Sequence, residues 1–253
     1  MSALRSKAGL SGSYPVHSPK LAGWWSFADQ ADPITDRSGK AIDLNVVSGA
    51  VANIQGYGAG RAQYEASALP CVYAVTTTTD YDLNDANTSY LFMCRMNIAV
   101  GTTGNGGILA KANNNGASGN IIKYATGRII VQMLGANVLT SNEANLHNGT
   151  DFHIAIIVDR DTGTVSLYIN GTLDKSVSGV PVETTDLSSY PLVFSGYGRT
   201  GAWVNGLENN GGIIQIWDNQ FYFDTGGMPA DIATSIARIA ANEGTALTSA
   251  ELP

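Results

Sequence analysis

Carboxylates are the first residues to test for chemistry, because paired carboxylates perform general acid and base catalysis in enzymes that cleave sugars. Such a pair must flank the scissile bond, and on a strand its members would alternate onto one face. Asp159 and Asp161, which stand only two residues apart, flank an expected hairpin turn instead. The six glutamates are isolated from one another: Glu65, Glu143, Glu183, Glu208, Glu243 and Glu251. We therefore expect no glycosidase site of this kind.

Other catalytic patterns are also missing. The sequence has no serine nucleophile elbow, and its histidines, His17, His147 and His153, are scattered. The segment GTTGNGG at 101–107 lacks the Lys-Ser/Thr pair of a phosphate-binding loop, so it is predicted to be a hairpin tip. A zinc site needs clustered Cys or His residues, and the sequence has no such cluster. We expect a protein that is not an enzyme.

Calcium is the one metal for which the sequence offers candidate ligands. The segment DYDLNDANTS at 80–89 supplies Asp80, Asp82, Asn84 and Asp85, which are the hard oxygen ligands that calcium prefers. A solvated turn with its Asx side chains bonded to the local backbone explains the same residues and is the favoured interpretation. Apart from calcium, no cofactor is expected.

Aromatic residues in glycine-rich segments are the candidates for ligand binding. SGYGRTGAWVNG at 195–206 contains Tyr197, Arg199 and Trp203, and NIQGYGAG at 53–60 contains Tyr57. Aromatic rings stack on sugar faces, while Arg and Asn side chains bond sugar hydroxyls. The alternative, that Trp203 lies in the core and Tyr197 packs at a strand end, fits the sequence equally well. The other tryptophans that stand within predicted strands are expected in the core: Trp24, Trp25 and Trp217.

Composition and charge exclude several classes of protein. Of 253 residues, 44% are hydrophobic and 14% are charged, which indicates a large core rather than disorder. The net charge of −7 and the absence of a basic run argue against nucleic-acid binding. No run approaches the roughly 18 apolar residues of a membrane span. The beginning, MSALRSKAGLSGSYPVHSP, contains no apolar segment of a secretory signal, so we expect synthesis in a cytoplasm. For this reason Cys71 and Cys94 are expected to be buried free thiols rather than a disulfide.

Three parts are distinguished along the chain. Residues 1–20 are rich in Ser, Gly and Pro and predict an extended arm. Residues 21–225 form a series of short strands with Gly and Asn turns, typical of two packed antiparallel sheets. Within 226–253, a helix over about 229–242 carries the apolar stripe Ile232, Ile236 and Ile239. We expect this helix at the sandwich edge, followed by a loose tail.

The most regular stretch is FHIAIIVDRDTGTVSLYINGTLDKSVSG at 152–179. Its first strand is almost continuously apolar, as expected for a strand covered on both faces. The dipeptide Asn170-Gly171 predicts a type I′ hairpin turn, which requires positive φ at both residues. The last strand is polar, and Lys175 suits a sheet edge because its charge opposes pairing with another chain.

This stretch also carries a family resemblance. Its residues fit the W-H-x-x-A-x-x-x-D…G-x-x-x-L-Y-x-N-G core of laminin-G-like, concanavalin A-like jelly-roll domains. LAGWWSFADQADPITDRSGKAIDLNV resembles the family's first strand and its D-x-S-G turn (Asp36, Ser38, Gly39), and NGLENNGGIIQIWDNQFY resembles its closing strand. The matching residues of the core are Phe152, His153, Ala155, Asp159, Gly163, Leu167, Tyr168, Asn170 and Gly171.

The resemblance covers about residues 21–225 and implies an all-β, two-sheet antiparallel jelly-roll sandwich, with the arm and the helix as additions. Related sandwich glucanases carry two glutamates and an aspartate on one strand, and no segment here matches that pattern. Related lectins bind calcium and sugars at the sandwich rim. The resemblance therefore indicates the architecture but does not identify the ligand.

The functional expectation is a non-catalytic structural or adhesion protein of a bacteriophage virion, namely a tail fibre, collar or capsid-decoration protein. Its expected partners are copies of itself, other virion proteins and cell-surface glycan, with neither nucleic acid nor membrane insertion. The basis is a resemblance: taken together, low charge, abundant Gly, Asn and Thr, and an arm that needs something to hold it resemble bacteriophage virion proteins, in which sandwiches of this type occur. The alternatives are a free carbohydrate-binding lectin and a glycan-active hydrolase or lyase.

Overall fold

A computed structural model describes most of the predicted strands and the helix. The described residues are 17–25, 36–40, 44–46, 62–65, 73–75, 83, 87–102, 105–112, 118–181, 187, 190–194, 196–199, 202–205, 213–225 and 227–253.

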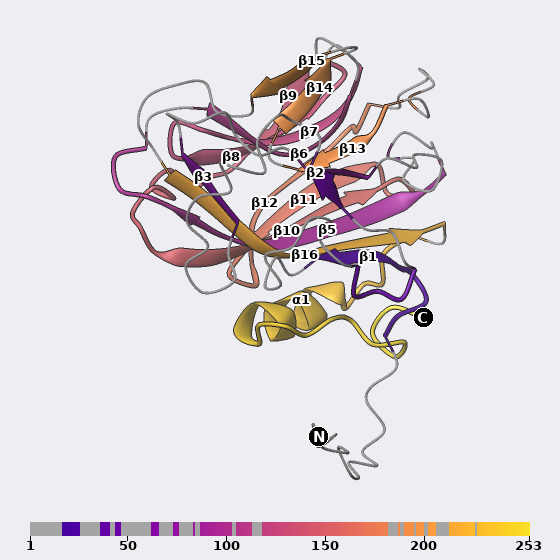
Figure 1. The fold of residues 1–253 in the computed structure, drawn as a ribbon. Coiled ribbons are helices and arrows are strands. Elements are labelled where there is room, and N and C mark those ends of the chain that lie inside the picture. Colours follow the sequence, from indigo (N-terminus) through magenta and orange to yellow (C-terminus); the bar gives the residue numbers. More distant parts are fainter. Residues whose placement is uncertain are drawn as a thin grey trace, which may run out of the picture.

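Two antiparallel sheets face each other, which confirms the predicted all-β two-sheet sandwich (Figure 1). The first runs in the order β1 (Leu21–Trp25), β16 (Ile213–Asp224), β5 (Ser89–Ile98), β10 (Asp151–Asp159), β11 (Thr164–Ile169) and β12 (Thr172–Ser178), and β3 (Ala62–Glu65) also pairs with β16. The second runs β2 (Asn45–Val46), β4 (Tyr73–Val75), β13 (Leu192–Phe194), β6 (Asn105–Ala112), β7 (Gly119–Ala125), β8 (Arg128–Met133) and β9 (Ala136–Thr140). A separate hairpin joins β14 (Gly196–Arg199) to β15 (Ala202–Asn205).

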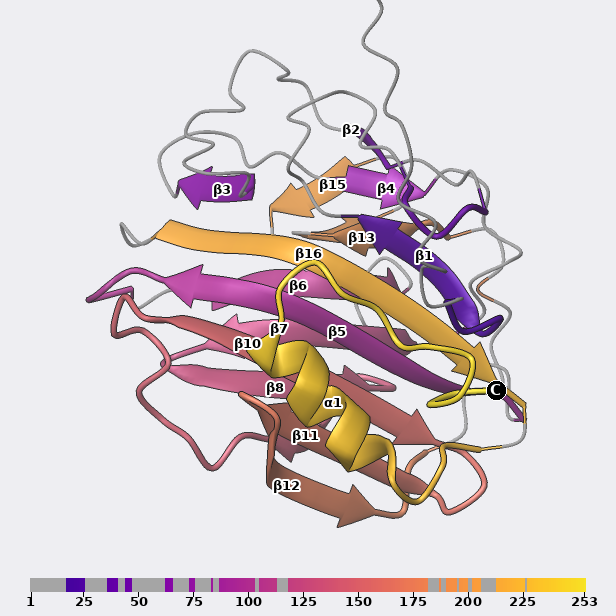
Figure 2. The same ribbon diagram turned by 90° about the horizontal axis from the view of Figure 1, so that it is seen from below.

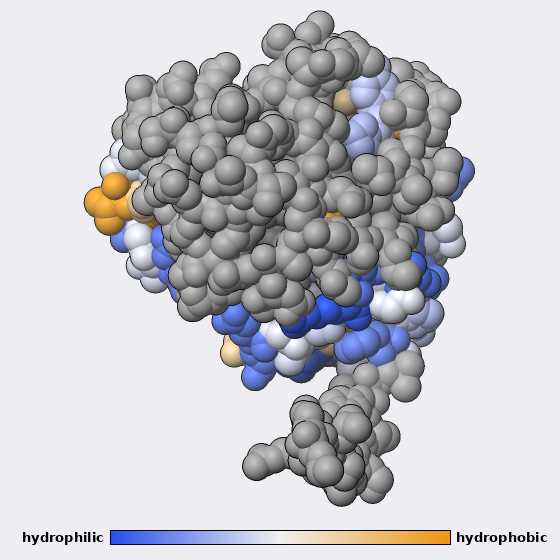
Figure 3. Space-filling model, in the orientation of Figure 1, coloured by the Kyte–Doolittle hydropathy of each residue, from blue (hydrophilic) through white to orange (hydrophobic). Residues whose placement is uncertain are grey.

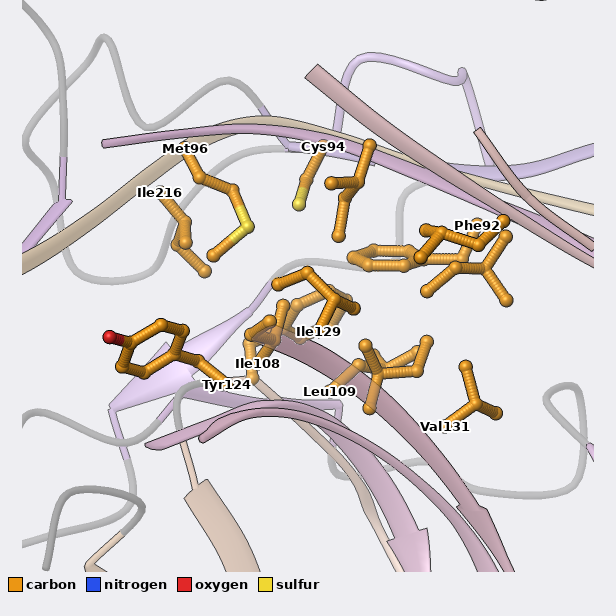
Figure 4. Packing of buried hydrophobic residues seen from close by; sticks show 14 of the residues in the cluster. Phe92, Cys94, Met96, Ile108, Leu109, Tyr124, Ile129, Val131 and Ile216 are labelled. Carbon is orange, nitrogen blue, oxygen red and sulfur yellow. The ribbon is translucent and has the colours of Figure 1, made fainter. Parts of the chain in front are cut away.

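The main core lies between the sheets. β5 is central in the first sheet and sends Phe92, Cys94 and Met96 inward (Figure 4). Aromatic contacts cross the interface, with ring centroids 6.3 Å apart for Phe92 and Phe194 and 5.2 Å for Trp25 and Phe194. Along β5, alternation places every second side chain in this core, because successive side chains of a strand point to opposite faces.

The meander at 152–179 folds as its sequence predicts. β10 is buried along almost its whole length, and β12 forms an edge of the first sheet. Asn170 and Gly171 have φ values of 50° and 79°, as the predicted type I′ turn requires. The edge residue Lys175 donates from Nζ to the carbonyl of Thr140 at 3.1 Å.

The helix α1 (Ile232–Ala241) carries the predicted stripe, and Ile232, Ile236 and Ile239 are all buried. Its expected position at the sandwich edge was wrong: α1 lies across the outer face of the first sheet (Figure 2). The reason is a second apolar surface on that face, formed by Leu91, Met93, Ala155, Ile157 and Tyr222, which the helix covers. None of the described helical segments is long and apolar enough to span a membrane.

The segment after α1 is not the loose tail that was expected. Ala246, Leu247 and Leu252 are buried in the same cluster as the helix. The backbone N–H of Ser18 donates to the carbonyl of Leu247 at 2.9 Å, and His17 forms a β-bridge with Thr248. The last residues of the predicted arm are therefore held by the carboxy-terminal segment of their own chain.

Candidate functional site

The hairpin β14–β15 contains three of the four predicted ligand-binding residues. Its register pairs Tyr197 with Val204, Gly198 with Trp203, and Arg199 with Ala202. Directly paired residues share a face of a hairpin, and neighbours along a strand alternate. Positions 197 and 199 thus belong to one face and position 203 to the other, so the hairpin presents two different surfaces.

The hairpin contacts the second sheet through β14 and β6, on the opposite side of the molecule from α1 (Figures 1 and 2). The outer side of that sheet carries a small apolar cluster, Ala110, Ala112 and Ile121. Beside it, Lys123 Nζ donates to Gln132 Oε1 at 2.8 Å. The three apolar side chains are buried, so this cluster contributes to packing and is not open to a ligand.

The visible described surface carries no broad apolar patch (Figure 3). Among the described residues, the large hydrophobic side chains that are exposed stand apart in the sequence: Val100, Leu134 and Leu173. Scattered exposed apolar residues are normal on a monomer and do not by themselves mark an interface.

The calcium candidates Asp80, Asp82, Asn84 and Asp85, like Tyr57, lie outside the described residues. Within that segment Leu83 is described, and its carbonyl accepts hydrogen bonds from Asn120 Nδ2 at 3.1 Å and Arg160 Nη2 at 3.2 Å. A guanidinium bonded to the middle of the segment opposes a divalent cation there, because like charges repel. In the described part of the chain, no group of three or more His, Cys, Asp or Glu could hold a metal.

Asp36 has the turn role that its D-x-S-G motif predicts. Its carboxylate accepts from the backbone N–H of Trp24 at 3.0 Å, and from Ser38 through its N–H at 2.8 Å and its hydroxyl at 2.6 Å. Gly39 follows with a φ of 84°. This carboxylate ties the turn to β1.

Asp159 likewise bonds its own hairpin. Oδ1 accepts from the N–H of Asp161 at 3.0 Å, and Oδ2 accepts from the Thr162 hydroxyl at 2.8 Å. The described histidines do not come together either, since His17 lies beside the carboxy-terminal segment, His147 follows β9 and His153 lies in β10. The described residues therefore bring no acid–base pair into one site.

The sequence-based analysis missed a buried polar network beneath the end of α1. Asp218 has a φ of 53° and lies in a bulge of β16 opposite β5. It accepts from Trp24 Nε1 at 2.7 Å and from the N–H of Gly244 at 3.1 Å, and Arg95 Nε lies 3.8 Å from its Oδ2. The polar residues Asp-Asn-Gln in an otherwise apolar strand, IIQIWDNQFYF, were the available signal, because they interrupt the alternation.

The same network fastens the helix to the sheet. Arg95 donates through Nη2 to the carbonyls of Ile239 and Ala240, at 2.9 and 3.0 Å. Both carbonyls lie in the last turn of the helix, where a cation is favourable, and the carbonyl of Ile239 also accepts from the N–H of the C-cap residue Asn242 at 3.1 Å. Burial, followed by the nearby charge of Asp218, raises the pKa of the Cys94 thiol well above its usual value. Cys94 is a free, buried cysteine, and Cys71 lies outside the described residues.

Comparison with known proteins gives a fold and no family. No protein-family model and no curated protein matches the chain. Among solved structures, the binding domain of Paraclostridial Mosquitocidal Protein 1 is similar with a TM-score of 0.64 at 14% identity, over 87% of this chain and 52% of that chain. The binding domain of Botulinum Neurotoxin DC in complex with SialylT has a TM-score of 0.61 at 13% identity, over 88% of this chain and 51% of that one.

The receptor binding domain of Botulinum Neurotoxin Type G gives a TM-score of 0.58 at 15% identity, over 88% of this chain and 51% of that chain. This protein therefore spans about half the length of these solved chains. At such low identity, the likeness establishes the β-sandwich fold and leaves the ligand to be argued from this chain's own residues.

Proposed function

We propose that this chain is a non-catalytic binding module that attaches to cell-surface glycan. The observation that carries the proposal is the hairpin β14–β15, which places positions 197, 199 and 203 on a short two-stranded element that contacts β6 of the second sheet. Aromatic and Arg residues supply the stacking and the hydroxyl or carboxylate bonding that sugar recognition needs. Rigid elements hold such groups more precisely than long loops do.

The structural neighbours support this class of ligand. One neighbour comes from botulinum neurotoxin type C, whose cell entry depends on interaction with two ganglioside molecules. Another is the binding domain of Botulinum Neurotoxin DC in complex with SialylT. A third is a complex with rat synaptotagmin II, so the same architecture also serves as a protein receptor module. Each of those chains is about twice as long as the part that resembles this one.

The finer proposal is an adhesion or structural component of a bacteriophage virion, as a tail fibre, collar or capsid-decoration protein that forms homo-oligomers. It rests on the low charge, on the abundance of Gly, and on the predicted arm at residues 1–20. A free lectin has the same binding chemistry without the assembly. A glycan-active enzyme is the third candidate, and it predicts turnover.

A glycan array with purified protein tests the binding proposal. Tyr197→Ala and Arg199→Ala change one face of the hairpin, and Trp203→Ala changes the other. We expect at least one of these faces to lose about tenfold or more in affinity, since a stacked ring or a charged hydrogen bond contributes roughly 1–3 kcal/mol. Leu173→Ala is the matched control, because Leu173 is 51% exposed on the edge strand β12 of the other sheet.

Three outcomes would count against the proposal. If folded wild-type protein binds no glycan, or if all three variants bind like the Leu173→Ala control, this hairpin is not the site. If the protein releases reducing ends or unsaturated products from a polysaccharide panel, the non-catalytic assignment is wrong. Circular dichroism of each variant confirms that the sandwich has folded.

A further inference from the structure

His153 occupies an unusual place on the first sheet. Its neighbours Phe152 and Ile154 point into the main core, so His153 points to the outer face of β10. There it is 2% exposed, and neither ring nitrogen has a hydrogen-bond partner in the described part of the chain. A buried histidine without an acceptor has nothing to stabilise its protonated form.

The helix α1 is what covers this histidine. The cross-strand neighbour of His153 is Arg95, whose guanidinium reaches the carbonyls of Ile239 and Ala240 at the end of the helix. On the other side, the backbone N–H of His153 donates to Asn170 Oδ1 at 2.9 Å. The next residue, Gly171, packs so closely on Ala237 that a Cβ atom at position 171 would lie 2.6 Å from the Ala237 Cα.

The charges near His153 do not favour a second positive charge. Arg95 on β5 is the adjacent one, and Asp218 in the bulge of β16 is directed at Arg95 and at Trp24. On the helix side, Arg238 is paired with Glu251, and Glu243 accepts from the indole of Trp217. Two residues along β10, Asp151 accepts from Asn97 Nδ2. Thus none of these described carboxylates forms an ion pair that would stabilise a protonated imidazole at His153.

We propose that α1 and the segment that follows it, residues 232–252, form an acid-sensitive latch, in which protonation of His153 requires the helix to leave the sheet. The proton comes from solvent and stays on the imidazole once water can reach it. Opening uncovers the apolar residues Leu91, Met93, Ala155 and Ile157. It also releases the hold of Leu247 and Thr248 on residues 17 and 18.

The direction of the pH effect follows from the histidine. Burial, followed by the charge of Arg95, lowers the pKa of His153 from 6.5 to about 3 in the closed state. A histidine with a lowered pKa stabilises the closed state fully above pH 6.5, and this contribution is lost as the pH falls from 6.5 towards 3. The open population should therefore rise by up to tenfold per pH unit, or about 25-fold between pH 7 and pH 5.

Amide hydrogen exchange of the full chain at pH 7 and pH 5, corrected for intrinsic exchange rates, measures the latch. Wild-type protection over residues 232–247 should fall about 25-fold between these pH values, while β8 keeps its protection. His153→Gln cannot titrate, so its protection should be independent of pH in this range. His147→Gln is the matched control, because His147 follows β9 of the second sheet, and it should keep the wild-type response.

Equal pH dependence in wild-type protein and His153→Gln would overturn the proposal, as would equal loss of protection in β8, which means global unfolding. If His153→Gln does not fold, the imidazole C–H resonance of His153 in wild-type protein decides instead. A resonance that titrates near pH 6.5 while the helix amides stay protected would show that protonation needs no opening. These readouts are independent of glycan binding.

Discussion

The indole Nε1 of Trp24 donates a 2.7 Å hydrogen bond to Oδ1 of Asp218, so a side chain of β1 is held by a side chain of β16, 194 residues later. Both residues are buried. The same carboxylate accepts from the backbone of Gly244. Asp218 therefore joins the first described strand, the last strand and the segment after α1 at one point.

Asp218→Asn tests how much this junction contributes to stability. Asn tolerates the positive φ of position 218, so the change removes the charge and one acceptor while leaving the backbone unstrained. We expect a loss of about 1–3 kcal/mol in the free energy of unfolding, because the indole keeps a weaker acceptor or loses it. Urea unfolding followed by tryptophan fluorescence measures it, and an unchanged midpoint would show that the junction is dispensable.

Gly171→Ala tests the seating of α1. The new Cβ would lie 2.6 Å from Ala237 Cα, at a φ of 79° that side chains rarely adopt. Gly163→Ala is the matched control, since its φ is 65° but nothing lies within 4 Å. We expect the control to cost about 1 kcal/mol from backbone strain alone, and Gly171→Ala to cost about 2 kcal/mol more because the helix must shift. Equal losses in the two variants would contradict the packing described.

The lowered pKa of Glu251 predicts a loss of stability in acid, at lower pH than the loss predicted from His153. Its burial raises the pKa, but hydrogen bonds from Arg238 and Thr248 outweigh that effect and lower the pKa from 4.5 to about 2. The stabilisation is complete above pH 4.5 and is lost as the pH falls towards 2. Glu251→Gln should remove about 1 kcal/mol at pH 7 and flatten the pH dependence of unfolding below pH 4.5. Arg160→Lys is the control, because Arg160 donates to the carbonyls of Leu83 and Pro181 and not to Glu251. This variant should keep the wild-type pH dependence of unfolding below pH 4.5.

The assembly proposal predicts a change of mass when the predicted arm is shortened. Residues 17–20 bond to the segment after α1 and to Asp224 and should be kept, so the informative deletion removes residues 1–16. We expect a defined oligomer to become smaller by light scattering, while the unfolding midpoint stays the same. An intact oligomer after deletion would move attention to the sandwich and helix surfaces.

Calcium binding at 80–89 remains a prediction that a thermal shift can test. Arg160 donates to the carbonyl of Leu83 in the middle of that segment, and this positive charge lowers its attraction for a cation. We expect millimolar calcium and a chelator to give melting temperatures within about 1 °C of each other. A rise of several degrees with calcium, lost in Asp82→Asn, would establish the site.

Short-range patterns were sufficient for much of the architecture. Alternation and the Asn-Gly dipeptide predicted β10, β11 and β12 with their turns, because the φ values of Asn170 and Gly171 and the faces of neighbouring residues are local properties. The spacing of Ile232, Ile236 and Ile239 likewise predicted the helix and its apolar side. Tyr197, Arg199 and Trp203 were chosen from sequence as candidates in a glycine-rich loop, whereas their pairing into the hairpin β14–β15 was not predicted.

Only the tertiary structure decided what covers each apolar face. An apolar stripe specifies that a helix must pack, but not against which surface, and so α1 was expected at an edge that it does not occupy. The burial of His153, the contacts of Asp218 and the pairing of Ser18 with Leu247 join residues far apart in the chain. Such contacts depend on the summed packing of both sheets, which no local window of sequence contains.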